Sequence, residues 1–304
     1  MGLFKRTSTS AAPVTANRSK WKRRLLAVLA LLLLLLVLSP RLIAPTPLCN
    51  WLLSRALPQL QGGIHIGAAS LGWFRPPLLT DIEVRDSAGR ILLRIPRLEG
   101  SKCLAALLFH PFDLGEFRLT QPAVHIVCSR ESSNLEAVLA YWLRKKAVPS
   151  DFSIALDGVA VRVAAAQASV SLEEEDGGRK WSLDPLDLTV TIPRDRRTPL
   201  RLELSAVASD ADRAGRLNAE VSAHLVEMPG GAPRIRAEGE LKAGELPLDA
   251  ALPLLRRFRP QLNLAGRLNA NLKLLPSDGQ PGSPDLRLEG SVSARELAVS
   301  GALL

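Results

Sequence analysis

The chain has 304 residues, of which 47% are hydrophobic and 23% charged, and its formal net charge is +9. This length suits one or two domains with a sizeable core, and the composition excludes a disordered chain and a protein with many membrane spans. Three cysteines are too few for a disulfide framework, so they do not define the fold. The sequence leaves open whether Cys103 and Cys128 pair.

Residues 1–24 form a basic tail. They contain seven Lys and Arg residues and no acid, so the rest of the chain carries only +2 of the net charge. A nucleic-acid-binding protein needs its basic residues on the folded body, and here they lie in a short tail rich in Ser and Thr. We therefore expect no nucleic-acid partner.

An unbroken apolar run over residues 25–38 follows the tail. Extended to residue 44, it has twenty residues, which as a helix cover about 30 Å, the thickness of the hydrocarbon core of a membrane. Trp21 and Trp51 flank it at interfacial positions. The sequence therefore predicts a transmembrane anchor over residues 25–44. The alternative is a cleaved signal peptide, but no small residues suited to cleavage directly follow the run.

The basic tail also predicts the orientation of the anchor. Positive charges stay on the cytoplasmic side, so the N-terminus lies in the cytoplasm and everything after residue 45 lies across the membrane. In a bacterium this is a single-pass protein of the inner membrane with the bulk of its chain in the periplasm.

After the anchor, the dominant hydrophobic period is two. The clearest segments are residues 186–192, 200–206, 217–223, 268–274 and 286–292. Such alternation predicts strands with one apolar and one polar face. Helices are few: one is expected from Ser133 to about Lys146, and shorter candidates cover residues 50–60 and 248–258. We therefore expect a mainly β fold, an antiparallel sheet with a few short helices.

These helices are too few to cover the apolar face of a long sheet. The sheet must then fold on itself, close into a barrel, or hold something apolar. In the third case the apolar face is the wall of a groove, whereas in the first case the same residues form a self-covered sandwich core. The candidate residues lining such a groove are Leu217, Val221, Leu268, Leu272, Leu286, Leu288 and Val292.

The C-terminal half contains an internal repeat of about 51 residues. Ala-Gly-Arg-Leu-Asn-Ala at residues 214–219 recurs at 265–270, and sixteen of forty aligned positions are identical. Repeats of this size predict an array in which each unit stacks on its neighbour. The second unit stops short of its period, so we expect an incomplete repeat: either the chain is a fragment, or its last strand edge is left for a partner.

Residue patterns that carry chemistry are missing from the sequence. The four histidines are scattered, and no nucleotide-binding, metalloprotease or serine-hydrolase motif occurs. The acidic run at residues 173–176 precedes two glycines and is interpreted as a solvated hairpin loop in preference to a cation site. We therefore expect no enzymatic activity, no cofactor and no metal site.

An ordered series of short motifs lies between residues 20 and 140. After the anchor come Ala-Ser-Leu-Gly-Trp-Phe at 69–74, Asp86 with Gly89, Asp-Leu-Gly at 113–115, Pro122 and Asn134-Leu135. This series resembles the AsmA/TamB-like family of bacterial envelope proteins. Together with the tail (1–24) and the anchor (25–44), the resemblance divides the chain into an AsmA-like α+β region (45–150) and a repetitive β-groove (151–304), which it implies to be open and twisted.

The resemblance also implies a function. Members of this family are thought to carry lipid acyl chains along an apolar concave face, or otherwise to support assembly of the outer membrane. We therefore expect an inner-membrane-anchored groove protein whose partners are the membrane and a phospholipid or other acyl lipid. The alternative is a membrane-tethered scaffold that docks an envelope protein at its C-terminal strand edge.

Overall fold

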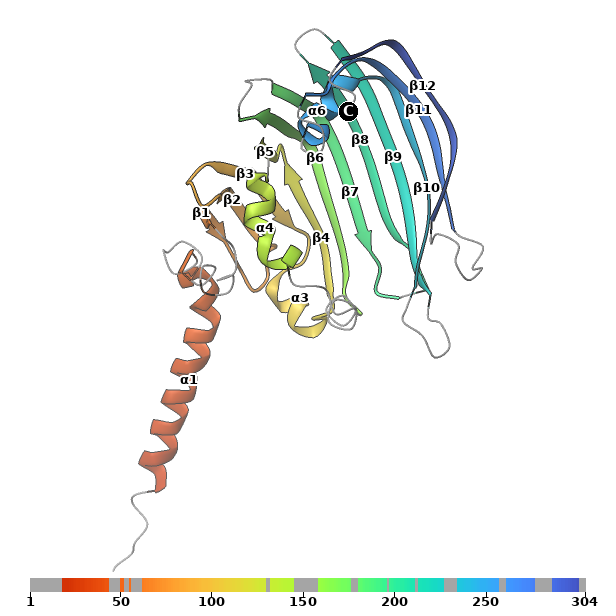
Figure 1. Cartoon of the computed structure of the whole chain (residues 1–304). Helices are drawn as coiled ribbons and strands as arrows, with labels where there is room; N and C mark the ends of the chain where they lie inside the picture. Colours follow the sequence, from red (N-terminus) through yellow and green to blue (C-terminus); the bar gives the residue numbers. More distant parts are fainter. Residues whose placement is uncertain are drawn as a thin grey trace, which may run out of the picture.

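The computed structural model describes residues 18–43, 50–51, 55, 62–129, 132–144, 158–175, 180–195, 197–210, 213–226, 234–256, 261–276 and 286–300. Over these residues the chain is mainly β, as the sequence predicts. Twelve strands form one sheet, and the helices are few (Figure 1).

The strands are β1 (Gly63–Ser70), β2 (Leu78–Arg85), β3 (Ile91–Gly100), β4 (Asp113–Thr120), β5 (Ala123–Cys128), β6 (Ala160–Glu174), β7 (Lys180–Ile192), β8 (Leu200–Asp210), β9 (Arg213–Val226), β10 (Arg234–Pro247), β11 (Asn263–Pro276) and β12 (Leu286–Ser300). The sheet order is β1-β2-β3-β4-β6-β7-β8-β9-β10-β11-β12, and β5 pairs with β3 and β6. All five segments predicted from the period of two lie within strands.

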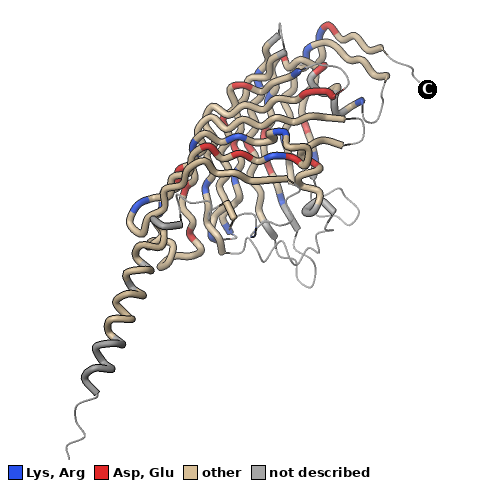
Figure 2. Tube along the Cα trace, turned by 90° about the vertical axis from the view of Figure 1, so that its left-hand side faces the viewer, with Lys and Arg blue, Asp and Glu red and all other residues tan. Residues whose placement is uncertain are grey.

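The first helix, α1 (Arg18–Ile43), leads away from the sheet (Figure 1). Its described leucine and valine side chains are exposed, and Figure 2 shows the helix extending away from the strands. Among the described residues, no helix combines the length and the hydropathy needed to cross a membrane.

The other helices are short. They are α3 (Leu104–Phe109), which the sequence analysis missed, α4 (Asn134–Arg144), the 3-10 turn η1 (Leu248–Ala251) and α6 (Leu252–Leu255). The predictions of helix from Ser133 and within residues 248–258 are therefore confirmed. Most of the candidate helix at 50–60 lies outside the described residues.

The sheet is mixed: the predicted antiparallel pairing holds for the other strand pairs, but β6 pairs in parallel with both β4 and β5. β4 and β5 lie one after the other along β6, and both pair antiparallel with β3 on their other side. Parallel neighbours need a crossover connection, and α4 lies between β5 and β6 in the chain. Alternation of apolar residues does not distinguish parallel from antiparallel pairing.

The strand register places apolar residues on one continuous face. Residues directly opposite each other in paired strands share a face of the sheet. One row of opposed residues crosses eleven strands without a polar side chain, and it consists of Ala69, Leu79, Leu98, Leu119, Ala165, Leu188, Leu204, Ala219, Leu241, Leu272 and Gly290. We call the side of the sheet that carries this row the apolar face.

Irregular residues bend the strands. Non-glycine residues with positive φ occur in β2, between β4 and β5, and in β6, β10 and β12: they are Asp81, Gln121, Gln167, Glu245 and Glu296. Register shifts accompany those in β6, β10 and β12. Since a bulge bends its strand and increases the twist, these positions account for the curved course of the strands in Figure 1.

The structure repeats with the period seen in the sequence. Leu217 pairs with Ala243, and 51 residues later Leu268 pairs with Ala294. A Cβ atom at Gly215 would meet the carbonyl oxygen of Glu245 at 2.6 Å. The repeated glycine packs against the equivalent part of β12 in the same way. Each unit is thus an antiparallel pair, β9 with β10 and β11 with β12.

Substitution of Gly215 tests this close packing. We expect Gly215→Ala to lower the free energy of unfolding by about 2 kcal/mol, because the added methyl group would press on the backbone of Glu245 and Leu246. Gly244→Ala is the matched control, since a Cβ there has open space, and its effect should stay within about 0.5 kcal/mol. Urea unfolding of the full chain measures both. Equal effects would contradict the packing.

Candidate functional site

The predicted lining residues lie together on the apolar face. Leu217 and Val221 lie on β9, Leu268 and Leu272 on β11, and Leu288 and Val292 on β12, and each is opposed by an apolar residue or a glycine. Leu286 lies opposite Pro276 in the register of β12, but its side chain is outside the described residues. The register therefore brings this predicted set onto one surface.

Burial of this face decreases toward β12. Two clusters are well packed, one around Ile66, Ile82 and Ile95 and one around Ala168, Leu186 and Ala206. On β12, by contrast, Leu288 is 67% exposed and Val292 is 60% exposed. The apolar face is thus most exposed at β12, whereas the lining residues on β9 and β11 are half-buried.

The segment η1–α6 covers one border of the apolar face. Glu174 ends β6 on this face, two residues after Leu172, which opposes Ile126. Arg256, directly after α6, donates from Nη1 to Oε1 and Oε2 of Glu174 at 2.9 and 2.8 Å. The side chain of Leu252, the first residue of α6, is fully buried. The ion pair thus holds the η1–α6 segment, which follows β10, against β6, four strands away from β10 in the sheet.

The opposite face is polar. A shallow hollow of about 410 Å³ lies on β7–β10, lined largely by charged and polar side chains. Glu203, Glu220 and Glu240 oppose one another there. A hydrogen bond from Lys242 holds the pKa of Glu240 below its usual value. Like charges directly opposite each other repel, and an apolar ligand would remove the water that screens this repulsion. This face therefore suits water and not an apolar ligand.

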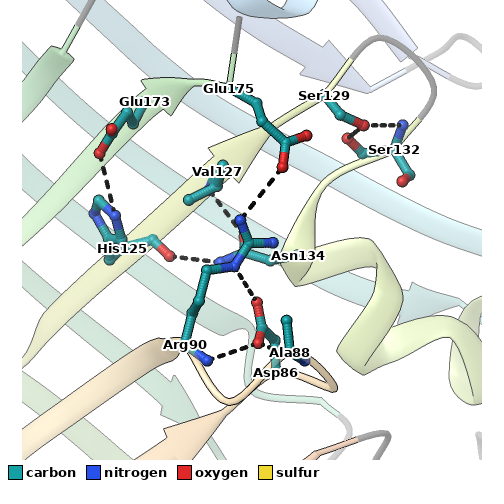
Figure 3. A network of polar contacts seen from close by, with 10 residues as sticks. All are labelled: Asp86, Ala88, Arg90, His125, Val127, Ser129, Ser132, Asn134, Glu173 and Glu175. Atoms are coloured by element: carbon teal, nitrogen blue, oxygen red, sulfur yellow. Dashed lines mark hydrogen bonds and ion pairs between the residues drawn. The ribbon is translucent and has the colours of Figure 1, made fainter. Parts of the chain in front are cut away.

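A polar network joins β2, β3, β5, β6 and α4 (Figure 3). Asp86, buried in the turn after β2, accepts hydrogen bonds from the backbone N–H of Ala88 and Arg90 at 2.9 and 2.8 Å. It also accepts one from Nε of Arg90 at 2.9 Å, and Nη1 of Arg90 reaches Glu175 at 3.4 Å. Burial opposes ionisation of Asp86, but these hydrogen bonds outweigh it and lower its pKa.

The start of α4 belongs to the same network. Ser133 and Glu136 form a reciprocal cap, in which each backbone N–H donates to the other side chain. Buried Asn134 accepts from the N–H of Val127 at 2.9 Å and donates to the carbonyl of His125 at 3.0 Å. These residues therefore fasten α4 to β5.

The acidic run lies at the end of β6 and in the turn after it, and its glutamates have ion-pair partners, which the expected solvated hairpin loop did not include. Glu173 faces Nε2 of His125 at 3.3 Å, Glu174 binds Arg256, and Glu175 binds Arg90. Asp176 lies outside the described residues. The partners of Glu174 and Glu175 are 82 and 85 residues away in the chain, so no local pattern reveals them.

His125 also contacts a hydroxyl group. Its Nδ1 lies 2.7 Å from Oγ of Ser171, and this hydroxyl donates to the carbonyl of Val124 at 3.4 Å. The Ser171 hydroxyl, the His125 imidazole and the Glu173 carboxylate thus form a row of contacts on one face of β5 and β6. The His125 and Glu173 side chains are more than one third exposed. These contacts tie β5 to β6.

Two further observations concern site chemistry. Among the described residues, no group of His, Cys, Asp and Glu is arranged to hold a metal ion. Cys103 and Cys128 do not form a disulfide, so the pairing that the sequence left open is not formed.

Comparison with protein-family models and curated proteins gives no relative. No protein-family model matches the chain, and no curated protein matches it.

The Asp86 turn gives a prediction about pH. Asp86→Asn should lower the free energy of unfolding by about 2 kcal/mol at pH 7, since the buried carboxylate loses its hydrogen bonds with Arg90 and Ala88. Because the pKa is lowered in the folded state, the stabilisation exists above the ordinary aspartate pKa and disappears as pH falls through the folded value.

Urea unfolding between pH 7 and pH 3 measures this difference. The gap between wild type and Asp86→Asn should stay constant at neutral pH and shrink below about pH 4. Asp81→Asn, at an exposed position, is the control and should change stability by less than about 0.5 kcal/mol. A gap that widens as pH falls would contradict the assignment.

Proposed function

We propose that the chain is an inner-membrane-anchored protein of the bacterial envelope whose apolar face binds the acyl chains of lipids. In this proposal it supports biogenesis of the outer membrane by holding or conducting lipid in the periplasm. The observation that carries the proposal is the continuous apolar row from β1 to β12, together with its exposure at β12.

The energetics of apolar burial support this occupant. Covering apolar surface yields about 25 cal/mol per Å², or about 0.8 kcal/mol for each CH₂ group. Large exposed apolar patches on proteins mark binding surfaces. An acyl chain lying across Leu288 and Val292 would remove their exposed surface from water without requiring any polar partner.

The length of the apolar row supports conduction. Strands lie about 4.8 Å apart, so eleven of them give a row about 48 Å long, which exceeds one extended acyl chain. A ligand held by apolar contact alone could occupy successive positions along such a row. Since η1–α6 covers one border, a lipid headgroup would lie at the uncovered border, in water.

The N-terminal helix is the proposed anchor. It has 26 residues, and its described leucine and valine side chains are between 38% and 63% exposed. The basic residues at its start would remain in the cytoplasm. The resemblance to the AsmA/TamB-like family supports the same arrangement, with an anchor followed by a periplasmic groove.

One observation favours the alternative, a tethered scaffold that docks an envelope protein at its terminal strand. β12 lies at the end of the sheet and pairs with β11 on one side. Edge strands bind other strands readily. The two functions use different surfaces, since lipid would cover the apolar face and a protein would bind the edge.

Lipid bound to the full chain, purified from bacterial membranes in mild detergent, tests the proposal. We expect native mass spectrometry to detect acyl lipid on the wild-type chain. Val292→Asp should reduce it at least about fivefold, because a carboxylate on the apolar face would be desolvated by the ligand. Val292 is exposed, so the substitution does not disturb a packed core.

Ser293→Asp is the matched control. It adds the same charge to the next residue of β12, which lies on the polar face, and should leave the bound lipid unchanged. A lipid-free wild-type chain, or equal loss in the two variants, would reject lipid binding on the apolar face.

A further inference from the structure

The outer edge of β12 ends the sheet (Figure 1). Among the described strands, β12 pairs only with β11, although it is 15 residues long. Its described side chains are all exposed. An edge of this kind presents backbone N–H and C=O groups to any strand of suitable register.

The junction between β10 and β11 shows how the protein itself covers such an edge. Glu245 of β10 has a φ of 54° and donates its backbone N–H to Oδ1 of Asn269 at 2.9 Å. Nδ2 of Asn269 donates to Oε1 of Glu245 at 3.0 Å, and Nη1 of Arg267 donates to Oε2 at 3.1 Å. The Arg and Asn of the Gly-Arg-Leu-Asn segment in β11 therefore hold the bulged glutamate from both sides.

β12 repeats the geometry of β10. Glu296 lies 51 residues after Glu245 and has a φ of 55°. A Cβ atom at Gly266 would lie 2.8 Å from the carbonyl oxygen of Arg295, 3.0 Å from that of Glu296 and 3.1 Å from Cα of Leu297, and the last two atoms are equivalent to neighbours of Gly215 in the first unit. The edge of β12 is thus a second copy of the β10 edge.

In the second copy, among the described residues, no strand lies across the edge from Glu296. The side chain of Glu296 is 69% exposed, compared with 36% for Glu245. Its ion pair is with Nε of Arg267, at 3.9 Å, which belongs to its own unit and not to a strand across the edge. The Asn and Arg contacts that the neighbouring strand supplies to Glu245 are those that a strand beside β12 would supply to Glu296.

We propose that the outer edge of β12 binds a β-strand of a partner protein that contains a Gly-Arg-Leu-Asn segment. The strand runs antiparallel to β12 in the register of β10 with β11. Its Asn binds the backbone N–H and the carboxylate of Glu296, and its Arg binds the same carboxylate. This inference does not depend on lipid binding, because it concerns the edge of the sheet and not its apolar face.

The register makes the proposal specific. In the β10–β11 pair, Lys242 opposes Asn271 and Ala243 opposes Ala270. A shift of 51 residues places Ser293 opposite the partner residue equivalent to Asn271, and Ala294 opposite the one equivalent to Ala270. Ser291 would lie two positions away from the first contact.

A synthetic peptide with the sequence of residues 261–276 is the probe for this edge. Fluorescence anisotropy should detect binding of the labelled peptide to the full chain in mild detergent. A peptide with Asn269→Ala should bind about tenfold more weakly, because the N–H and carboxylate of Glu296 lose their partner. A peptide of scrambled order should not bind.

A substitution in the protein tests the same contact from the other side. Glu296→Gly keeps the positive φ and the N–H but removes the carboxylate, so it should weaken the native peptide about tenfold. Ser293→Gly, the control, also places a glycine on β12 and should bind the peptide within about twofold of wild type. Equal affinities of the native and Asn269→Ala peptides would overturn the proposal, as would absence of binding.

Disulfide cross-linking tests the register. A peptide with Asn271→Cys should cross-link to the Ser293→Cys chain and not to the Ser291→Cys chain, with the wild-type chain and its native cysteines as the blank. Preferential cross-linking to Ser291→Cys would overturn the register. Concentration-dependent pairing of full chains through β12, competing with the peptide, would identify a second copy as the occupant and overturn the proposal of a partner strand.

Discussion

The apolar face depends on one constraint: apolar side chains must stay on the same side of the sheet across every irregularity of the strands. A bulge adds a residue, so an unbroken period of two would move the following side chains to the polar face. The sequence compensates with steps of three. In β6 the apolar series passes from Ala165 to Ala168, and in β10 it passes from Ala243 to Leu246, where the register shifts.

Much of the fold is therefore visible in the sequence, because alternation reports burial directly. The strands around Leu188, Leu204 and Leu272 and the shared face of the candidate lining residues follow from it. The parallel pairing of β6 does not, since alternation is the same for both directions. The ion pairs of the run at 173–175 also escape local reasoning, because their partners come from distant turns. The bulges leave a trace in the sequence, because the apolar residues there are three positions apart instead of two. This spacing can be recognised as a bulge only once the pairing with the neighbouring strands is known.

The motifs that carry the family resemblance form turns and caps in this structure. Asp86 closes the turn before β3, Gly115 has a φ of 75° directly after the start of β4, and Asn134 fastens α4 to β5. Each is required by local backbone geometry, and none lies on the apolar face of the repeat units. They therefore indicate how the N-terminal part folds, whereas an argument for function has to come from the surface that they leave uncovered.

The exposure of the apolar face and that of Glu296 at β12 have one physical cause. In a one-dimensional array each unit is buried by the units on both sides, so a terminal unit lacks half of its contacts. Inside the sheet, β11 shields the side chains of β10 and holds Glu245. β12 has a neighbour on one side among the described strands, so both its apolar side chains and its bulged glutamate face water. A lipid satisfies only the first of these exposures and a strand satisfies both, because a new strand brings its own apolar residues onto the face as well as its Asn and Arg to the edge. A bound strand would thus lengthen the apolar row by one step and give β12 the second neighbour that β10 already has.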